Sequence, residues 1–151
     1  MTQTGSGVLE TASEQETVAA GERLASSLSR GDVLLLYGEL GAGKTAFVRG
    51  LAQGLGASGE DVSSPTFTLI QEYRGASGPV LYHVDLYRLS AAEVDDLGLD
   101  ELIDGEAVVA IEWADRWPGR PAAAIEVRIE DEGADQRRIH IYRRARSAGG
   151  S

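Results

Sequence analysis

The residues with the clearest chemistry lie in the segment GELGAGKT, Gly38 to Thr45. This segment matches the phosphate-loop pattern G-x-x-x-x-G-K-[ST] at all four fixed positions. The apolar run VLLLY precedes it and a helical pattern follows it, which is the context that phosphate binding requires. We therefore expect a nucleotide-phosphate site here, with these contacts: Gly38, Glu39, Leu40, Gly41, Ala42, Gly43, Lys44, Thr45 and Ala46.

Lys44 is the only lysine among the 14 Lys and Arg residues of the chain. A lysine carries a compact charge on a thin stem, whereas the guanidinium group of arginine is a wide planar fork. The wider group should not fit between phosphates that the loop already encloses. We expect Lys44 to bridge the β- and γ-phosphates, and the Thr45 hydroxyl to bind Mg²⁺.

Two carboxylates at the ends of apolar runs could complete a metal site. LYHVD ends in Asp85, and VVAIE ends in Glu112. Glu112 follows the more apolar run, but aspartate is the commoner carboxylate on the metal in phosphoryl-transfer sites. We assign Asp85 to the metal. Glu112 is assigned to orienting the attacking water or sensing the γ-phosphate, and it is kept as a further candidate metal ligand beside Thr45.

The segment SSPTFT, Ser63 to Thr68, resembles a switch that closes on Mg²⁺ and the γ-phosphate. Thr66 is its best candidate residue, and the start of an ordinary strand is the alternative. The chain has no N-K-x-D motif for reading guanine, no arginine-rich lid and no ABC-type signature. A GTPase, a small-molecule kinase and an ABC ATPase are therefore disfavoured.

The order of these patterns predicts an α/β protein with a three-layer fold like that of P-loop NTPases and a mixed, partly antiparallel sheet. Capping-box patterns at Ser13 and Ser90 predict helices, the first ending near Gly31. A further helix is predicted from about 44 to 55. Strands are predicted at 33–37, 63–74, 80–89, 108–113, 124–130 and 137–143, with the second and third forming one hairpin and the last two another.

Composition limits the classes of function. We expect one domain over residues 1–144 and a flexible tail over 145–151. The chain lacks cysteine, which excludes disulfides and thiolate metal sites. No apolar stretch is long enough to span a membrane, and the beginning MTQTGSGVLE does not resemble a signal peptide, so a cytoplasmic location and no membrane contact are expected.

The formal net charge of -10 argues against general nucleic-acid binding. One basic cluster departs from this trend, and it consists of Arg137, Arg138, Arg143, Arg144 and Arg146. We interpret the cluster as a solvated edge strand with a frayed terminus. Contact with an RNA backbone or an acidic partner is the alternative.

Four motifs together resemble one family. GELGAGKT, SPTFTL, YHVDLYRL and the pair Glu112-Trp113 occur in this order, and they resemble the TsaE (formerly YjeE) family of P-loop ATPases in tRNA threonylcarbamoyladenosine biosynthesis. The resemblance covers about residues 28–117. Phe67 stands where such families often have tyrosine, which puts any role of that hydroxyl in doubt.

The resemblance implies an ATP- and Mg²⁺-binding protein that hydrolyses ATP slowly and acts with the TsaD and TsaB proteins, with little or no direct tRNA contact. It also implies catalytic or switch roles for Lys44, Thr66, Asp85 and Glu112, and a nucleotide-site role for Trp113. His83 shares a strand face with Asp85, and we expect it to be a hydrogen-bonded strand histidine. Arg49 and Arg88 could supply an arginine finger, although ordinary salt bridges are favoured.

Three functions remain open from the sequence. The first is an ATPase that acts as a switch in a tRNA-modification complex. The second is a nucleotide-gated binding module in which hydrolysis is incidental. The third is a kinase for a small metabolite, which the missing lid disfavours.

Overall fold

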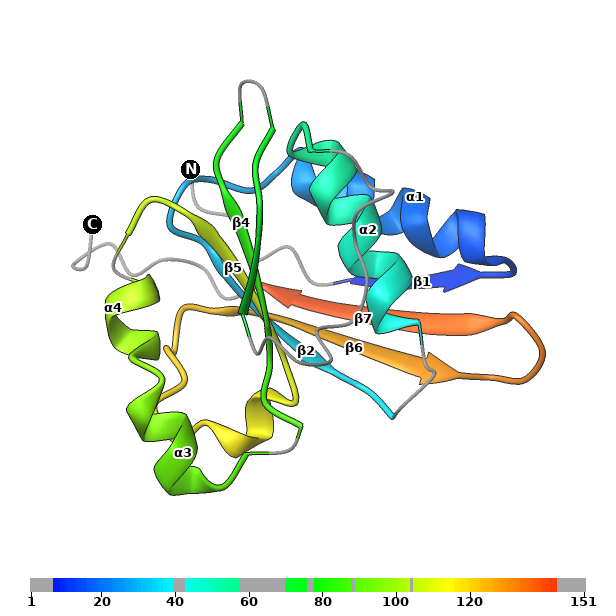
Figure 1. The fold of residues 1–151 in the computed structure, drawn as a ribbon. Helices are drawn as coiled ribbons and strands as arrows, with labels where there is room; N and C mark the ends of the chain where they lie inside the picture. The colour runs from blue at the N-terminus through cyan, green and yellow to red at the C-terminus, as the bar shows by residue number, and fades with distance from the viewer. Residues whose placement is uncertain are drawn as a thin grey trace.

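A computed structural model describes residues 7–39, 43–57, 70–75, 78–87, 89–103 and 105–143. These residues form one sheet flanked by helices (Figure 1). Its strands are β1 (Gly7–Thr11), β2 (Val33–Tyr37), β3 (Ile70–Tyr73), β4 (Leu81–Asp85), β5 (Val108–Glu112), β6 (Ile125–Asp131) and β7 (Arg137–Arg143). Its helices are α1 (Glu14–Ala25), α2 (Lys44–Gly54), α3 (Ala91–Asp96) and α4 (Leu99–Ile103), with a 3-10 turn η2 (Ala114–Arg116).

The sheet has the strand order β1-β7-β6-β2-β5-β4-β3. β2 pairs in parallel with β5 and β6, and β4 pairs in parallel with β5. The pairs β3–β4, β6–β7 and β1–β7 are antiparallel. The predicted α/β fold with a mixed, partly antiparallel sheet is therefore confirmed, and so are both predicted hairpins.

The prediction that β7 is an edge strand is wrong. β7 lies between β1 and β6, because the apolar residues at the start of the chain belong to a strand that pairs along its outer side. Its arginines are held by neighbouring elements: Arg138 contacts Glu10 of β1, and Arg143 contacts Ser27 after α1. The short sequence of β1 has too little alternation to predict a strand by itself.

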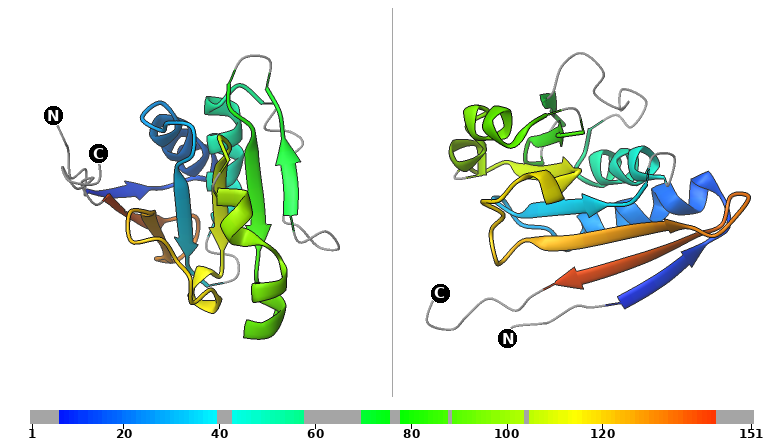
Figure 2. Two further views of the ribbon diagram at one scale, coloured as in Figure 1. Left: turned by 90° about the vertical axis from the view of Figure 1, so that its left-hand side faces the viewer. Right: turned by 90° about the horizontal axis from the view of Figure 1, so that it is seen from below.

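Two apolar layers cover the sheet on opposite faces (Figure 2). Leu34 and Leu36 of β2 pack toward α1 and α2, whereas Val33 and Leu35 pack toward α3, α4 and η2. Successive side chains of a strand point to opposite faces, so a strand covered on both sides must be apolar throughout. This is why VLLLY could be recognised as a central strand.

The first helix ends earlier than predicted, at Ala25 rather than near Gly31. Ser26 and Ser27 follow it, and their hydroxyls donate to the carbonyls of Arg23 and Leu24 at 2.7 Å and 2.8 Å. Serine side chains that bond nearby carbonyls compete with the helical hydrogen bonds. At the other end the Ser13 hydroxyl accepts from the Glu16 N–H, as the predicted cap requires.

The predicted capping box at Ser90 is complete, and two short helices follow it up to Ile103, as predicted. α2 also agrees with its predicted range. The predicted strand at 63–74 is seen only over Ile70–Tyr73, because residues 58–69 lie outside the described ranges. Among the described residues, none of the helices has the length and apolar character needed to cross a membrane.

α1 and α2 pack against each other (Figure 1), and their backbones come into contact where they cross. A Cβ atom on Gly50 would lie 1.9 Å from the Val18 carbonyl oxygen, and one on Gly21 would lie 2.1 Å from that of Phe47. Only glycine permits this approach. The crossing places the first turn of α1 beside the first turn of α2, where the phosphate loop ends.

Candidate nucleotide-binding site

The first turn of α2 presents the residues of the phosphate loop. Gly43 precedes the helix with φ 103°, a left-handed conformation that favours glycine. The helix then carries Lys44, Thr45 and Ala46, so its unpaired N–H groups and its positive dipole end face the loop. Leu40, Gly41 and Ala42 lie outside the described residues. Glu39 is exposed, and its role as a nucleotide contact stays a prediction.

The side chain of Lys44 is buried against three groups of the site. Its Nζ donates to the Gly38 carbonyl at 2.7 Å, lies 3.9 Å from Glu112 Oε1 and lies 4.2 Å from the centre of the Trp113 ring. Burial lowers the pKa of the Lys44 ammonium, and the negative charges of Glu112 and Asp85 oppose that change. The lysine is thus held among acceptors at the position where the loop meets the helix.

The two predicted carboxylates lie side by side. β4 and β5 are parallel neighbours, and Asp85 is in register with Glu112 at their carboxyl ends. Burial raises the pKa of Asp85, the Tyr87 N–H that donates to it lowers it, and the charge of Glu112 raises it further. The structure therefore brings Asp85, Glu112 and Lys44 together, as the strand-end positions predict.

Glu112 is buried more deeply than a solvated strand-end acid, with only 4% of its surface exposed. One of its oxygens, Oε2, contacts Nε2 of His83 on β4. The expectation that His83 is a hydrogen-bonded strand histidine is confirmed, and the ring itself is fully buried.

Trp113 leaves the sheet directly after Glu112 and does not extend β5 as the sequence predicted. Its φ of 58° lies in the left-handed region, which is unusual for a bulky residue and costs about 1 kcal/mol or more. The turn brings its ring over Lys44 and to 4.8 Å from the ring of Tyr87. The ring of Trp113 therefore lies against Lys44, and its role in nucleotide binding stays a prediction.

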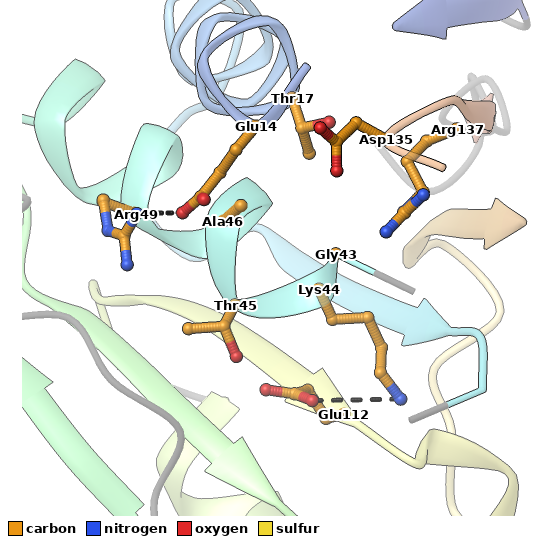
Figure 3. Close-up of a pocket in the computed structure, with 10 residues that line it drawn as sticks. All are labelled: Glu14, Thr17, Gly43, Lys44, Thr45, Ala46, Arg49, Glu112, Asp135 and Arg137. Carbon is orange, nitrogen blue, oxygen red and sulfur yellow. Dashed lines mark hydrogen bonds and ion pairs between the residues drawn. The ribbon is translucent and has the colours of Figure 1, made fainter. Parts of the chain in front are cut away.

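A pocket of about 360 Å³ opens beside the first turn of α2 (Figure 3). Its lining residues come from α1, α2, β5 and the β6–β7 turn: Glu14, Thr17, Gly43, Lys44, Thr45, Ala46, Arg49, Glu112, Asp135 and Arg137. In Figure 3 the side chains of Lys44 and Thr45 both extend from α2 toward Glu112. Asp85 is not among these lining residues, although it adjoins Glu112 in the sheet.

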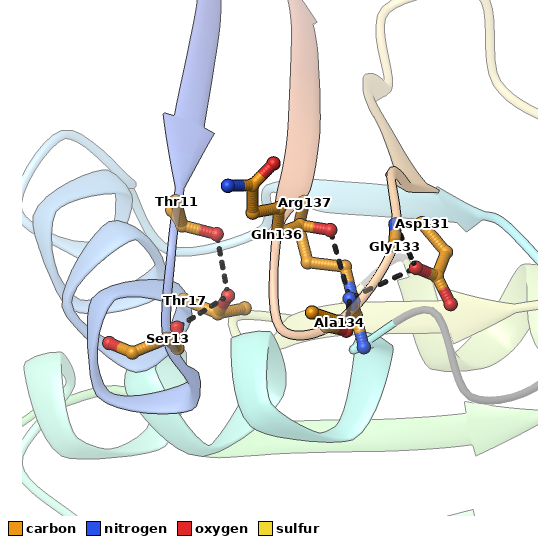
Figure 4. Close-up of polar contacts among 8 residues, drawn as sticks. All are labelled: Thr11, Ser13, Thr17, Asp131, Gly133, Ala134, Gln136 and Arg137. Atoms are coloured by element: carbon orange, nitrogen blue, oxygen red, sulfur yellow. Dashed lines mark hydrogen bonds and ion pairs between the residues drawn. The ribbon is translucent and has the colours of Figure 1, made fainter.

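Four residues of the pocket, Glu14, Thr17, Asp135 and Arg137, were not predicted as site residues. Arg137 Nη1 bonds Asp131 Oδ1 at 3.1 Å and the carbonyls of Ala134 and Gln136 at 3.0 Å and 2.9 Å (Figure 4). These bonds orient the arginine at the turn, beside the loop. Its place in an arginine-rich strand was visible in the sequence, but the pairing of distant strands that brings it here was not.

Thr17 is placed by a similar contact at the other wall of the pocket. Its hydroxyl lies 2.9 Å from that of Thr11 at the end of β1, and it also donates to the Ser13 carbonyl (Figure 4). Next to it, Arg49 forms a 2.8 Å salt bridge with Glu14, so the favoured interpretation of Arg49 as a salt-bridge residue is confirmed. Arg88 and the predicted switch residue Thr66 lie outside the described residues.

The donor set fits a magnesium ion that is shared with phosphates. Within the described ranges no group of three or more His, Cys, Asp or Glu residues could hold a metal by itself. Mg²⁺ in nucleotide sites normally takes one or two carboxylates and completes its shell with phosphate oxygens and water. The Thr45 hydroxyl and the adjoining carboxylates of Asp85 and Glu112 are oxygen donors of that kind.

Comparisons with known proteins agree with this geometry. Residues 11–139 match the family model described as "Threonylcarbamoyl adenosine biosynthesis protein TsaE". A tRNA threonylcarbamoyladenosine biosynthesis protein TsaE from Nostoc sp. is 46% identical over 136 residues, which cover 85% of this chain and 82% of that protein. One from Bacillus subtilis is 44% identical over 130 residues, covering 85% of this chain and 80% of that protein.

A solved structure, that of YdiB from Bacillus subtilis, superposes with a TM-score of 0.73 at 34% identity. The superposition covers 93% of this chain and 87% of that one. The sequence and structure comparisons therefore both cover most of the chain. The chain belongs to the TsaE family, whose role is in the biosynthesis of threonylcarbamoyladenosine in tRNA.

Proposed function

We propose that this chain binds MgATP and hydrolyses it slowly, as a switch that acts with the TsaD and TsaB proteins in tRNA modification. The observation that carries the proposal is the meeting of the phosphate-loop helix with the ends of β4 and β5. Lys44 and Thr45 come from the helix, and the paired acids Asp85 and Glu112 come from the strands. This combination serves phosphoryl transfer in P-loop enzymes.

Each residue would have a distinct task in the reaction. Lys44 would exchange the Gly38 carbonyl and the Trp113 ring for phosphate oxygens, which an ammonium group binds more strongly. Thr45 and Asp85 would hold Mg²⁺, which neutralises charge on the phosphates when it is bound. Glu112 would hold the attacking water through the oxygen that faces the pocket.

The nucleoside would occupy the part of the pocket between α1 and the β6–β7 turn. This part adjoins the first turn of α2 and offers polar groups from Thr17, Asp135 and Arg137. A phosphate chain held by the loop would thus lead directly into it. Thr66 remains the proposed switch residue on the γ-phosphate side.

The contacts that Arg49 and Arg137 make within the chain support slow ATP hydrolysis by the chain alone. Arg49 is paired with Glu14, and Arg137 is bonded to Asp131 and to the turn carbonyls. Both arginines are thus engaged by neighbouring groups of the chain, although Arg137 lies close to Gly43 at the loop. A stabilising cation supplied by a partner would raise the rate strongly. Binding through partner proteins in the cytoplasm also suits the acidic charge of the chain.

Phosphate release from MgATP tests the proposal. The purified chain should show low turnover alone, faster turnover with TsaD and TsaB, and none with Lys44→Ala. ATP binding without any turnover under either condition would contradict the hydrolytic function.

A second assay separates hydrolysis from binding. Formation of threonylcarbamoyladenosine on tRNA is measured with the complete set of proteins, comparing wild type with Glu112→Gln. Loss of product with retained ATP binding supports the switch ATPase. Full activity of Glu112→Gln would instead favour a nucleotide-gated module, and a phosphorylated small molecule would favour a kinase.

A further inference from the structure

A buried contact behind the pocket joins His83 and Glu112. His83 is fully buried, and Glu112 is exposed by only 4%. The ring nitrogen Nε2 contacts the carboxylate oxygen Oε2, so a strand residue that does not line the pocket touches one that does. A buried polar contact of this kind needs a reason, because apolar residues could fill the same space at less cost.

The sheet register explains how the two side chains meet. His83 is opposite Ala110 on β5, and Glu112 lies two residues further along that strand, on the same face. The two side chains therefore meet diagonally across the parallel pair, where Nε2 contacts Oε2. The small side chain of Ala110 leaves room for the imidazole to extend toward Glu112.

The two oxygens of Glu112 have different surroundings. Oε2 contacts His83, whereas Oε1 lies 3.9 Å from Lys44 Nζ at the pocket. A carboxylate that is held by one oxygen cannot rotate freely about its last bond. The contact with His83 therefore determines which way the second oxygen faces.

The other nitrogen of the His83 ring adds to this argument. Nδ1 is buried and has no hydrogen-bond partner among the described residues. Donation to a carboxylate requires the proton to be on Nε2. Among the described residues the ring is therefore held through its Nε2 contact with Glu112 and not through Nδ1.

We propose that His83 is a positioning residue that orients the Glu112 carboxylate toward the nucleotide pocket through Nε2. The inference rests on the proposed function, because it assigns to His83 the orientation of a group that acts in hydrolysis. Partners that orient a reactive carboxylate or a metal ligand typically change activity by about tenfold to a hundredfold when they are removed. The effect should appear in kcat, with little change in KM for ATP, because the phosphate loop is untouched.

Three substitutions separate positioning from packing. His83→Gln keeps an amide N–H near the position of Nε2, whereas His83→Asn puts its amide near Nδ1 and cannot reach Glu112. His83→Leu fills the space without any donor. We expect kcat to fall about tenfold to a hundredfold for Asn and Leu and to stay within about threefold of wild type for Gln, with KM within about threefold throughout.

The second histidine provides a matched control. His140 also contacts a glutamate, Glu130, at 2.9 Å, but this pair is exposed on the sheet and away from the pocket. His140→Gln should leave kcat and KM unchanged. Thermal unfolding of each variant shows whether a loss of activity merely follows a loss of folded protein. Equal losses for Gln and Asn, or full activity of Leu, would overturn the inference.

A readout without nucleotide separates this inference from the proposed function. The chain has two histidines, so ¹⁵N-labelled histidine gives two sets of ring signals, which the His140→Gln variant assigns. We expect His83 to carry its proton on Nε2, with a proton signal that shifts in Glu112→Gln. A proton on Nδ1 alone would overturn the inference even if ATP is hydrolysed. Absence of hydrolysis by wild type with the expected signals would instead contradict the proposed function alone.

Discussion

Lys44 shows how a single residue can be prepared for an anion. Its side chain is 4% exposed, and the ammonium contacts the Gly38 carbonyl, the Glu112 carboxylate and the face of Trp113. All three are groups that attract a cation, so the charge is tolerated in a buried position. A guanidinium group is wider and planar, so it would not make these three contacts with the same geometry.

Replacement of Lys44 by arginine should therefore not preserve the site. We expect Lys44→Arg to weaken MgADP binding by at least about tenfold, close to the effect of Lys44→Ala, because losing a charged hydrogen bond costs about 1.5–3 kcal/mol. Calorimetric titration measures the affinity. Arg128→Lys, on the adjoining strand β6 where the Arg128 guanidinium lies 5.1 Å from the centre of the Tyr37 ring, is the control and should bind normally because Arg128 does not line the pocket. Normal MgADP binding by Lys44→Arg would show that a guanidinium group does fit at this position.

Asp85→Asn should raise the midpoint of thermal unfolding at pH 7 without nucleotide. Burial raises the pKa of Asp85 above 3.8, with Glu112 adding to the shift and Tyr87, His83 and Lys44 opposing it. The folded protein thus binds this proton more tightly than the unfolded chain, so stability falls as pH rises from about 4 through the folded pKa. Since the Asp85 side chain is partly exposed, we expect the unfolding midpoint of Asp85→Asn to rise by at most about 4 °C. This corresponds to a gain in stability of about 1 kcal/mol.

Calorimetric scans at several pH values check this prediction. The advantage of Asp85→Asn should disappear near pH 3, where the carboxyl is protonated in both states. Asp95→Asn, an exposed change on α3, should have no effect at either pH. With MgATP present the order should reverse, because the variant loses a metal ligand. A lower unfolding midpoint for Asp85→Asn than for wild type at pH 7 without nucleotide would contradict the prediction that the charged Asp85 side chain destabilises the fold.

At the scale of elements, the crossing of α1 and α2 brings residues of both helices to the walls of the pocket. The glycine contacts hold α1 against α2, so Glu14 and Thr17 stand beside the phosphate-loop turn. A helix packed at this distance cannot accept even a methyl group at the crossing. The geometry of the site thus depends on two glycines that lie outside the phosphate-loop motif.

Gly50→Ala should destabilise the protein although alanine favours helices. A Cβ there would lie 1.9 Å from the Val18 carbonyl oxygen, so the helices must separate. Overpacking costs about 1–3 kcal/mol, which we expect to exceed the helix-propensity gain of about 1 kcal/mol. Urea unfolding measures the change. Gly7→Ala is the control, since no atom lies within 4 Å of its Cβ position, and equal stability of the two variants would contradict the argument.

Local sequence patterns predicted most of the helices and strands. The features that depend on which distant strands become neighbours could not be predicted in this way. β2 and β5 were recognisable as apolar runs covered on both faces, and their carboxyl ends located Glu112 beside the loop. β7 was wrongly predicted to be an edge because β1 is short and lies at the other end of the chain. The pocket contributions of Thr17 and Arg137 were missed for the same reason, since they depend on which distant elements become neighbours.

At the scale of the whole molecule, charge determines the choice of partner. The formal net charge is -10, and arginines of β7 are paired with acids such as Glu10 and Asp131. Neutralised arginines give little attraction to a phosphate backbone. Contact with tRNA is therefore expected to run through partner proteins.

The isolated chain should bind tRNA only weakly. We expect a Kd above about 10 μM at physiological salt, in the range of non-specific binding. Anisotropy of labelled tRNA measures it, and a repeat with TsaD and TsaB present shows whether the complex binds. Sub-micromolar binding by the chain alone, lost in Arg138→Glu, would show that the arginine cluster is an RNA contact after all.

The position of β2 in the sheet has a consequence for synthesis in the cell. The two strands that pair with it, β5 and β6, are both synthesised much later than the apolar run VLLLY of β2. Both edges of β2 lack partners until β5 has been made, and the edge that pairs with β6 lacks one until synthesis has passed Asp131. Such non-local pairing slows folding and leaves an apolar strand open to association with other chains. A chaperone that shields nascent apolar segments would therefore matter most during this interval.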